Sequence, residues 1–328
     1  MLAPARCVPA PARRALDTFV RGERARYAAA ITRARAFLDG LEVDPVKLRA
    51  RGLKGKKKLV EALDAYHRLY QIASPEDRPA LLARVEELAR PTIEDRYHDM
   101  LTVDDREFHE DATSYLRAAV LLDGFGLDIS RYRAGIAAAK GRLDAHLRER
   151  GPHQRRAFHG YYQHFGLAEP FTLEGALEQG LIARKAPPDE LARADVYALT
   201  HEVYAAYDFG DRQDEEPFAD PERLYLRGAL PRLAATWRDR HDPDLVAELV
   251  ACLRYLRFTG DPEYPGALRY LLDAQNADGS WGDYQAARAR LGDLVKQGFY
   301  LHTTMVAIEA LSLGFAEVFR RGEGPQCP

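Results

Sequence analysis

Two histidines and one aspartate have the residue types and spacing that could hold a divalent metal ion. His201 and Asp208 are seven residues apart in a predicted helix, so they project within about 20° of the same face. They would be about 10 Å apart along the helix axis, so both could bind one ion only if the helix ends between them. Gly210 indicates such an end near Asp208. With His302 as a third ligand, the set would suit zinc, iron or magnesium with open positions for substrate. The alternative is that these side chains are hydrogen-bonded core and loop residues.

An acidic segment, Thr102–Asp111, could supply a proton donor. A carboxylic acid that its neighbours keep neutral can protonate an alkene or epoxide, and Asp105 and Asp111 are the candidates for that role. Tyr204 and Tyr300 complete the predicted catalytic set, because each is close in sequence to a metal candidate. The alternative for the acidic segment is the first turn of a solvated helix, where the helix dipole favours carboxylates.

Two further segments have both a functional and a structural interpretation. Lys54-Gly-Lys-Lys-Lys58 could bind a phosphate or an acidic partner, or it could be a solvated approach to a helix. The aromatic and histidine-rich run Phe158–Phe165 could line an apolar pocket, or it could pack between helices.

Composition excludes several classes of protein. The 328 residues carry 47 Lys and Arg against 50 Asp and Glu, a net charge of −3, which argues against nucleic acid as the main partner. No run approaches the ~20 apolar residues of a membrane span. Three widely spaced cysteines form neither a disulfide framework nor a metal motif, so we expect a soluble protein of the cytoplasm.

Apolar residues recur mostly at spacings of three and four, which predicts an all-α fold. The predicted helices are Ala15–Leu38, Lys58–Ile72, Pro79–Leu88, Asp111–Leu122, Arg131–Glu149, Arg155–Phe165, Leu173–Gln179, Pro188–Tyr207, Pro221–Arg238, Asp244–Phe258, Pro265–Gln275, Tyr284–Gln297 and Thr303–Arg320. Successive helical units open about 40–55 residues apart, the spacing of helix–turn–helix repeats. We expect one domain over residues 14–321, an α/α toroid that encloses a central cavity, with disordered tails at 1–13 and 322–328.

One motif makes this architecture more specific. Gln275-Asn-Ala-Asp-Gly-Ser-Trp-Gly-Asp283 resembles the Gln…Gly-x-x-Trp turn of triterpene cyclases and protein prenyltransferase β-subunits. Asp278-Gly279 supplies a tight turn with positive φ, and Trp281 can lock two successive helices. The runs Glu110–Ser130 and Gly298–Leu311 are similar to segments of plant terpene synthases and of prenyltransferase β-subunits, respectively. The chain is thus identified as a divergent member of the terpenoid cyclase and protein prenyltransferase toroids.

The resemblance implies a fold and a site. In prenyltransferase β-subunits the histidine that matches His302 is a zinc ligand, but the Asp-x-Cys that accompanies it is absent here. The Asp-x-Asp-Asp of acid-initiated cyclases and the Asp-Asp-x-x-Asp that binds magnesium are also absent. We therefore expect a metal-dependent biosynthetic enzyme acting on a small, lipid-like or short peptide substrate in the cavity. A metal-free acid-initiated cyclase and a non-catalytic helical-ring binding protein remain the alternatives.

Overall fold

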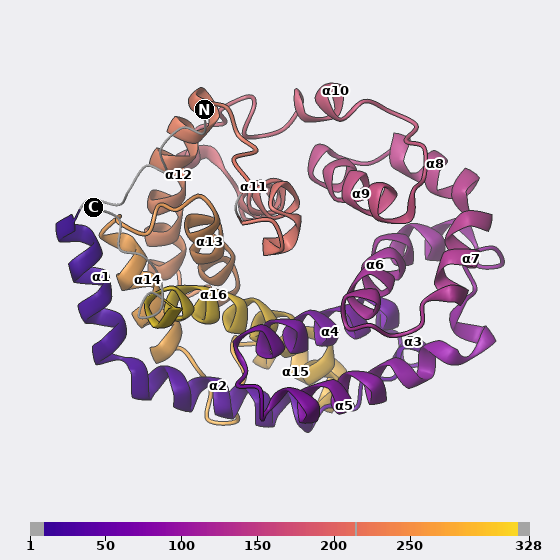
Figure 1. The fold of residues 1–328 in the computed structure, drawn as a ribbon, viewed down its shortest axis with the longest axis horizontal. Coiled ribbons are helices and arrows are strands. Elements are labelled where there is room, and N and C mark those ends of the chain that lie inside the picture. Colours follow the sequence, from indigo (N-terminus) through magenta and orange to yellow (C-terminus); the bar gives the residue numbers. More distant parts are fainter. Residues whose placement is uncertain (1–9, 214, 321–328) are drawn as a thin grey trace.

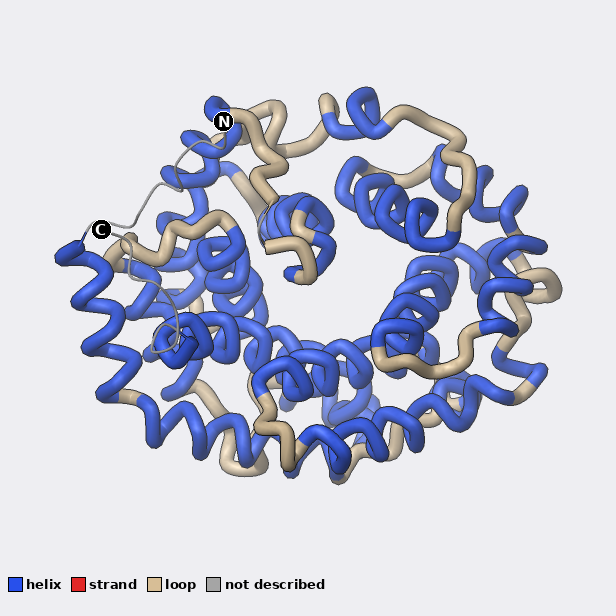
Figure 2. The backbone as a smooth tube through the Cα atoms, in the orientation of Figure 1, coloured by secondary structure: helices blue, strands red, loops and turns tan. Residues whose placement is uncertain are grey.

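The computed structural model describes residues 10–213 and 215–320. Within this part of the chain every regular element is a helix, and only Gln275 and Trp281 pair as an isolated antiparallel bridge (Figure 2). The predicted all-α fold class is confirmed. No helix among the described residues is long and apolar enough to cross a membrane.

One set of helices surrounds the middle of the molecule in Figure 1. They are α4 (Gly55–Ile72), α6 (Asp105–Gly124), α9 (Pro152–Phe165), α11 (Arg193–Ala206), α13 (Pro243–Tyr255) and α16 (Leu301–Arg320). Each packs against the next in chain order, and α16 packs against α4, so the succession of contacts returns to its start. We call these six the inner helices.

Other helices lie outside the inner helices and pack against them (Figure 1). They are α1 (Ala10–Gly22), α2 (Arg24–Asp39), α5 (Arg78–Ala89), α7 (Ser130–Ala138), α8 (Lys140–Arg148), α10 (Leu173–Leu177), α12 (Asp220–Asp239) and α14 (Glu263–Asp273). Two short helices, α3 (Pro45–Ala50) and α15 (Gln285–Leu291), lie in the connections. Single helical turns occupy the segments 90–93, 95–97, 188–190, 208–210 and 292–294, and a π-helical turn occupies 296–300.

Burial explains the apolar composition of the inner helix α13. It contacts α11, α12, α14 and α16, and every residue from Asp244 to Leu253 is buried. A helix with neighbours on all sides has no polar face to present to water, so its sequence is apolar all round. Asp244 and Glu248 are the acidic exceptions within that stretch, and both belong to the site described below.

The Gln275–Trp281 turn joins three helices. Gly279 has a φ of 92°, as predicted, and Trp281 is fully buried. The Trp281 indole donates to the carbonyl of Leu271 at 2.7 Å, and its backbone N–H donates to the Thr304 hydroxyl at 3.2 Å. The Gln275 amide donates to the carbonyl of Ala30 at 2.8 Å. The turn therefore ties α14 to α16 and to α2.

Several predicted boundaries differ from the structure. The predicted helix over residues 15–38 is interrupted at Glu23, and that over 131–149 is interrupted at Ala139, where the backbone leaves helical ψ. The helix predicted from Tyr284 ends at Leu291, and α3 was not predicted, because six residues are too few for a visible period. The structure starts α1 at Ala10, inside the expected tail of residues 1–13. Residues 1–9 and 321–328 lie outside the described part of the chain.

Replacement of Gly279 by alanine tests the turn. A left-handed φ costs a non-glycine residue about 1–3 kcal/mol, and the added Cβ would lie 2.2 Å from the carbonyl oxygen of Arg33. We expect Gly279→Ala to lower the free energy of unfolding in urea by at least that amount. Gly228→Ala, at an exposed position in α12 with nothing within 4 Å, should raise it by up to about 1 kcal/mol. Equal stability of the two variants would contradict this account of the turn.

Candidate functional site

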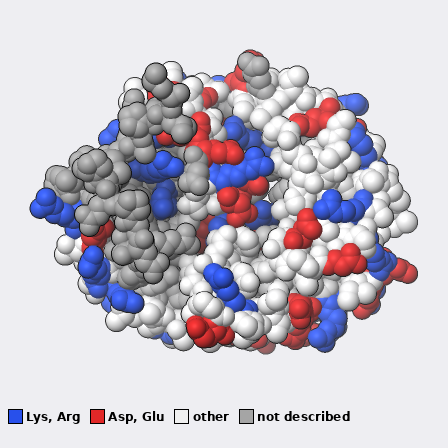
Figure 3. Space-filling view, in the orientation of Figure 1, with Lys and Arg blue, Asp and Glu red and all other residues white. Residues whose placement is uncertain are grey.

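A cavity of about 640 Å³ lies between the inner helices. Five of these helices line it with residues three or four positions apart, the spacing of one helix face, and α13 contributes Glu248. The volume is typical of a site for a small molecule. Its charged lining residues have both signs, and Figure 3 shows basic and acidic side chains together near the middle of one face. We call it the central cavity.

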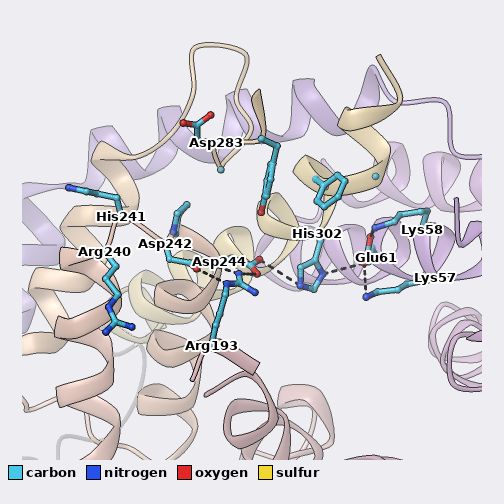
Figure 4. Close-up of a pocket in the computed structure, with 15 residues that line it drawn as sticks. Lys57, Lys58, Glu61, Arg193, Arg240, His241, Asp242, Asp244, Asp283 and His302 are labelled. Carbon is cyan, nitrogen blue, oxygen red and sulfur yellow. Dashed lines mark hydrogen bonds and ion pairs between the residues drawn. The ribbon is translucent and has the colours of Figure 1, made fainter. Parts of the chain in front are cut away.

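A smaller cavity of about 480 Å³ lies beside it, at the N-terminal ends of α4 and α13 (Figure 4). Both cavities are lined by Lys57, Glu61 and His302, so these three side chains form the boundary between them. A group at such a boundary can reach a molecule in either cavity. The smaller cavity is also lined by Asp244 and Tyr284.

The imidazole of His302 lies among three carboxylates from two other helices. Its Nδ1 is 3.2 Å from an oxygen of Glu61 on α4. Its Nε2 is 3.7 Å from Asp244 and 3.8 Å from Glu248, both on α13. The first turn of α16 thus places His302 where α4, α13 and α16 meet, and Figure 4 shows its ring between Glu61 and Asp244.

These carboxylates keep His302 protonated. Burial alone would lower the pKa of His302, but Asp244, Glu248 and Glu61 together raise it to about 10. Burial alone would raise the pKa of Glu61, whereas Lys58 and His302 lower it to about 2. At neutral pH the centre therefore contains an imidazolium beside an ionised Glu61. The ring can donate a proton or a charged hydrogen bond to a molecule in either cavity.

A second histidine faces Glu248 from the other side. His201 Nδ1 is 3.7 Å from Glu248 and 2.9 Å from the carbonyl oxygen of Tyr197. Burial, with repulsion from His153, lowers the pKa of His201 to about 3, so its ring is neutral. When Nδ1–H donates to the Tyr197 carbonyl, Nε2 is left as an acceptor. Glu248 itself accepts a hydrogen bond from Thr200, and burial raises its pKa.

Buried ion pairs and a strained segment form the other end of the central cavity. Arg68 on α4 lies 3.3 Å from Glu309 on α16, and Arg117 on α6 donates to Asp64 at 2.6 Å. Phe209 lines the cavity here, with the Arg117 guanidinium 4.9 Å from the centre of its ring. Asp208 and Phe209 have φ values of 48° and 53°, a costly conformation for non-glycine residues.

The structure separates the predicted site residues into two groups. His201, His302 and Tyr204 line the central cavity, and burial raises the pKa of Tyr204 well above 10. Asp208 does not line it: α11 ends at Ala206, and the carboxylate of Asp208 lies 3.6 Å from Arg212. The helix thus ends too early for His201 and Asp208 to share a helix face.

The other predicted catalytic residues lie outside both cavities. Asp105 is 90% exposed and its carboxylate lies 2.8 Å from Arg142. Asp111 is buried but pairs with Lys56 at 2.8 Å. The Tyr300 hydroxyl accepts a hydrogen bond from the backbone N–H of Tyr284. Among these three residues, none lines the central or the smaller cavity.

Glu61, Asp244 and Glu248 were not among the site residues predicted from the sequence. A signal for Glu248 was present, because a single acid within Leu-Val-Ala-Glu-Leu-Val-Ala251 must be buried with the apolar residues around it. Buried carboxylates require partners, so such an acid is a candidate site residue. Asp244 is one helical turn before Glu248 and shares its face. Glu61 gave no comparable signal, since it follows a run of lysines that could all be solvated.

Within the described residues, no three His, Cys, Asp or Glu side chains are already arranged as a metal-ligand set. The nearest carboxylate oxygens of Asp244 and Glu248 lie 3.7 and 3.8 Å from His302 Nε2. That is wider than the roughly 3.3 Å between ligand atoms of a tetrahedral zinc with bonds near 2.0 Å. A metal ion at this point would need the side chains to draw together.

Fold and site define an all-α protein with a charged, largely buried centre between two cavities. Residues 14–311 match the model of a domain of unknown function, DUF6895, and the chain belongs to that family. No curated protein and no solved structure gives a significant match to the chain.

The charge of His302 makes stability depend on pH. The pKa of His302 is about 10 in the folded protein, against 6.5 for an ordinary histidine in the unfolded chain. Protonation of His302 therefore contributes fully to the free energy of unfolding below pH 6.5, and this contribution is lost as the pH rises through 10. We expect the free energy of unfolding to fall between pH 7 and pH 10 by a smaller amount in His302→Gln than in the wild type. His164→Gln, which removes a surface ring beside Asp123, should behave as the wild type does. Identical pH dependence in all three proteins would contradict a protonated His302.

Proposed function

We propose that the inner and outer helices form an α/α toroid and that this protein is an enzyme acting on a small polar molecule in the central cavity. Support for the toroid comes from the closed succession of contacts among the inner helices. It also comes from the direction of two neighbouring helices. Glu61 on α4 contacts His302 on α16, and seven residues later on each helix Arg68 contacts Glu309. The two helices therefore run parallel to each other.

The observation that carries the enzymatic proposal is the position of His302. It is a largely buried imidazole held between Glu61 on one side and Asp244 and Glu248 on the other, at the boundary of two cavities. Three buried carboxylates around one ring are expensive to maintain, and structural packing alone does not require them. Groups held in this way in a cleft are typical of acid–base catalysis.

We assign the acid role to His302 and a hydrogen-bonding role to His201. The two rings approach opposite oxygens of Glu248, and their surroundings move their pKa values apart, to about 10 and about 3. Such separation within one site lets an imidazolium donate a proton while a neutral ring accepts a hydrogen bond. Asp105 and Asp111 lie outside the cavities, so an acid-initiated reaction in the central cavity would use His302 instead.

A metal-dependent reaction is the second candidate. The Nδ1–H of His201 can donate to a backbone carbonyl, and His302 has a carboxylate at Nδ1, which are the outer partners that metal-bound histidines usually have. Asp244 or Glu248 would replace Asp208 as the acidic ligand. A bound divalent ion would supply Lewis acidity beside the cavity.

Incubation of the protein with a small-molecule extract of cells, followed by mass spectrometry, tests the enzymatic proposal. We expect the wild type to consume at least one compound. His302→Gln and Glu248→Gln should slow that consumption by about 100-fold or more, the usual contribution of an acid or base. Asp105→Asn, at an exposed position, should leave it unchanged. A compound that binds without change, or turnover that survives both site variants, would favour a binding protein or another site.

Elemental analysis of untagged protein tests the second candidate. Metal dependence predicts about one zinc, iron or magnesium ion per chain, with less in His302→Ala and His201→Ala. Turnover by metal-free protein, or metal content that neither substitution lowers, would leave the acid–base proposal alone.

A further inference from the structure

Three consecutive lysines at the start of α4 have different surroundings. Gly55 begins the helix against α3, and a Cβ there would lie 1.8 Å from the carbonyl oxygen of Pro45. This close contact fixes the rotation of α4 about its axis. Since successive helical residues point about 100° apart, Lys56, Lys57 and Lys58 face three directions.

The first two lysines have ordinary structural roles. Lys56 is buried between two carboxylates, Asp99 at 2.6 Å and Asp111 at 2.8 Å, and it lines neither the central nor the smaller cavity. Lys57 is 43% exposed at the boundary of the cavities, and its ammonium lies 3.7 Å from Glu61. Neither arrangement indicates more than an ion pair or a solvated charge.

Lys58 combines burial with access to a cavity. Its side chain is 8% exposed, it lines the smaller cavity, and its Nζ donates to Glu61 at 2.7 Å. Figure 4 shows the Lys58 amine directed at the Glu61 carboxylate, with His302 on the other side of that carboxylate. Amine, carboxylate and imidazolium thus lie in series along the cavity wall.

The surroundings of Lys58 favour its neutral amine more than water favours that of an exposed lysine. Burial lowers the pKa of Lys58, and Lys57 acts in the same direction. Glu61 and, more weakly, Asp244 oppose the change, but the pKa remains below its usual value. A lysine that is desolvated beside a cavity is one of the recognised forms of an activated amine nucleophile.

We propose that Lys58 is a nucleophile that forms an imine with the carbonyl group of an aldehyde or ketone held in the smaller cavity. The nucleophilic role of Lys58 is distinct from the acid role of His302. This proposal rests on the proposed function only in the step where His302 donates a proton. The ligand class follows from the chemistry of the amine, because carbonyl carbon is the electrophile with which lysine condenses reversibly. The smaller cavity, at about 480 Å³, is large enough for such a compound.

The reaction balances without an oxidant or reductant. The Lys58 amine attacks the carbonyl carbon, a C–N bond forms, the C=O π bond breaks, and one amine proton passes through Glu61 to the carbonyl oxygen, which gives a carbinolamine. His302 protonates the carbinolamine hydroxyl, the C–O bond breaks to release water, and the nitrogen lone pair forms the C=N bond of a protonated imine, which then loses its remaining N–H proton. Carbonyl compound and amine thus give imine and water. Glu61 lies within reach of both the amine and the imidazole, so the proton can return to His302 through it.

Reductive trapping on the wild-type protein tests the proposal. Glycolaldehyde with sodium cyanoborohydride at pH 7 converts imines to stable secondary amines, and peptide mass spectrometry locates them. A lowered pKa increases the fraction of free amine at pH 7. We expect Lys58 to be alkylated severalfold faster than the exposed Lys54, with Lys56 as an internal control that stays unlabelled. Labelling of Lys58 that is no faster than that of Lys54 would overturn the proposal.

Two variants separate this inference from the proposed function. Lys58→Arg keeps the charge beside Glu61 and should lose the label while Lys54 reacts as before. His302→Gln should slow labelling at Lys58 alone. If His302→Gln leaves the Lys58 rate unchanged, the nucleophile stands and the acid role of His302 fails. Circular dichroism of both variants, compared with the wild type, shows whether the fold is retained.

Discussion

The arrangement of this protein depends on the pairing of buried charge at His302. An ionised group costs several kcal/mol when it leaves water, and it is tolerated only with partners close by. Glu61 comes from α4, Asp244 and Glu248 from α13, and the histidine from α16. None of these helices can rotate or slide without leaving a buried charge alone, at a cost of about 3–5 kcal/mol. The cluster therefore fixes the register of three neighbouring helices.

The same constraint explains why the site is polar while the helices around it are apolar. α13 is buried along its length, so Asp244 and Glu248 are acceptable only because Arg193, Thr303, Thr200 and the two histidines surround them. Groups that are held this firmly are already oriented before a ligand arrives. Such preorganisation is the main way in which a protein site stabilises developing charge.

At the far end of the central cavity the backbone is strained, which is a second energetic cost near the site. Asp208 and Phe209 keep a strained left-handed backbone, and Gly210 continues it with a φ of 88°. Arg68 donates to the carbonyl of Phe209, and Asp211 accepts from His67, so the segment is held from two sides. A Cβ on Gly210 would lie 2.6 Å from the Tyr255 hydroxyl. The strain persists because these contacts outweigh it, and the Phe209 ring thereby lines the end of the cavity.

Local features of the sequence determined the helical fold and some of the site. The three-and-four spacing was enough to predict all-α structure, and Asp278-Gly279 was enough to predict a turn with positive φ, because both depend on neighbouring residues only. His201 and His302 were identified from their types and flanking motifs, and both line the central cavity. Asp208 was grouped with them from helical periodicity, but α11 ends at Ala206, and where a helix ends depends on its contacts as well as its period.

Tertiary structure alone decided which charged residues matter. Lys56, Lys57 and Lys58 are adjacent residues of one type. One is held between two carboxylates, one is half-exposed, and one is buried beside a cavity. Glu61 becomes part of the site only because α4 and α16, some 240 residues apart in the chain, pack together. The free energy of a charge depends on its burial and on partners from other helices, and neither is visible in the residues beside it.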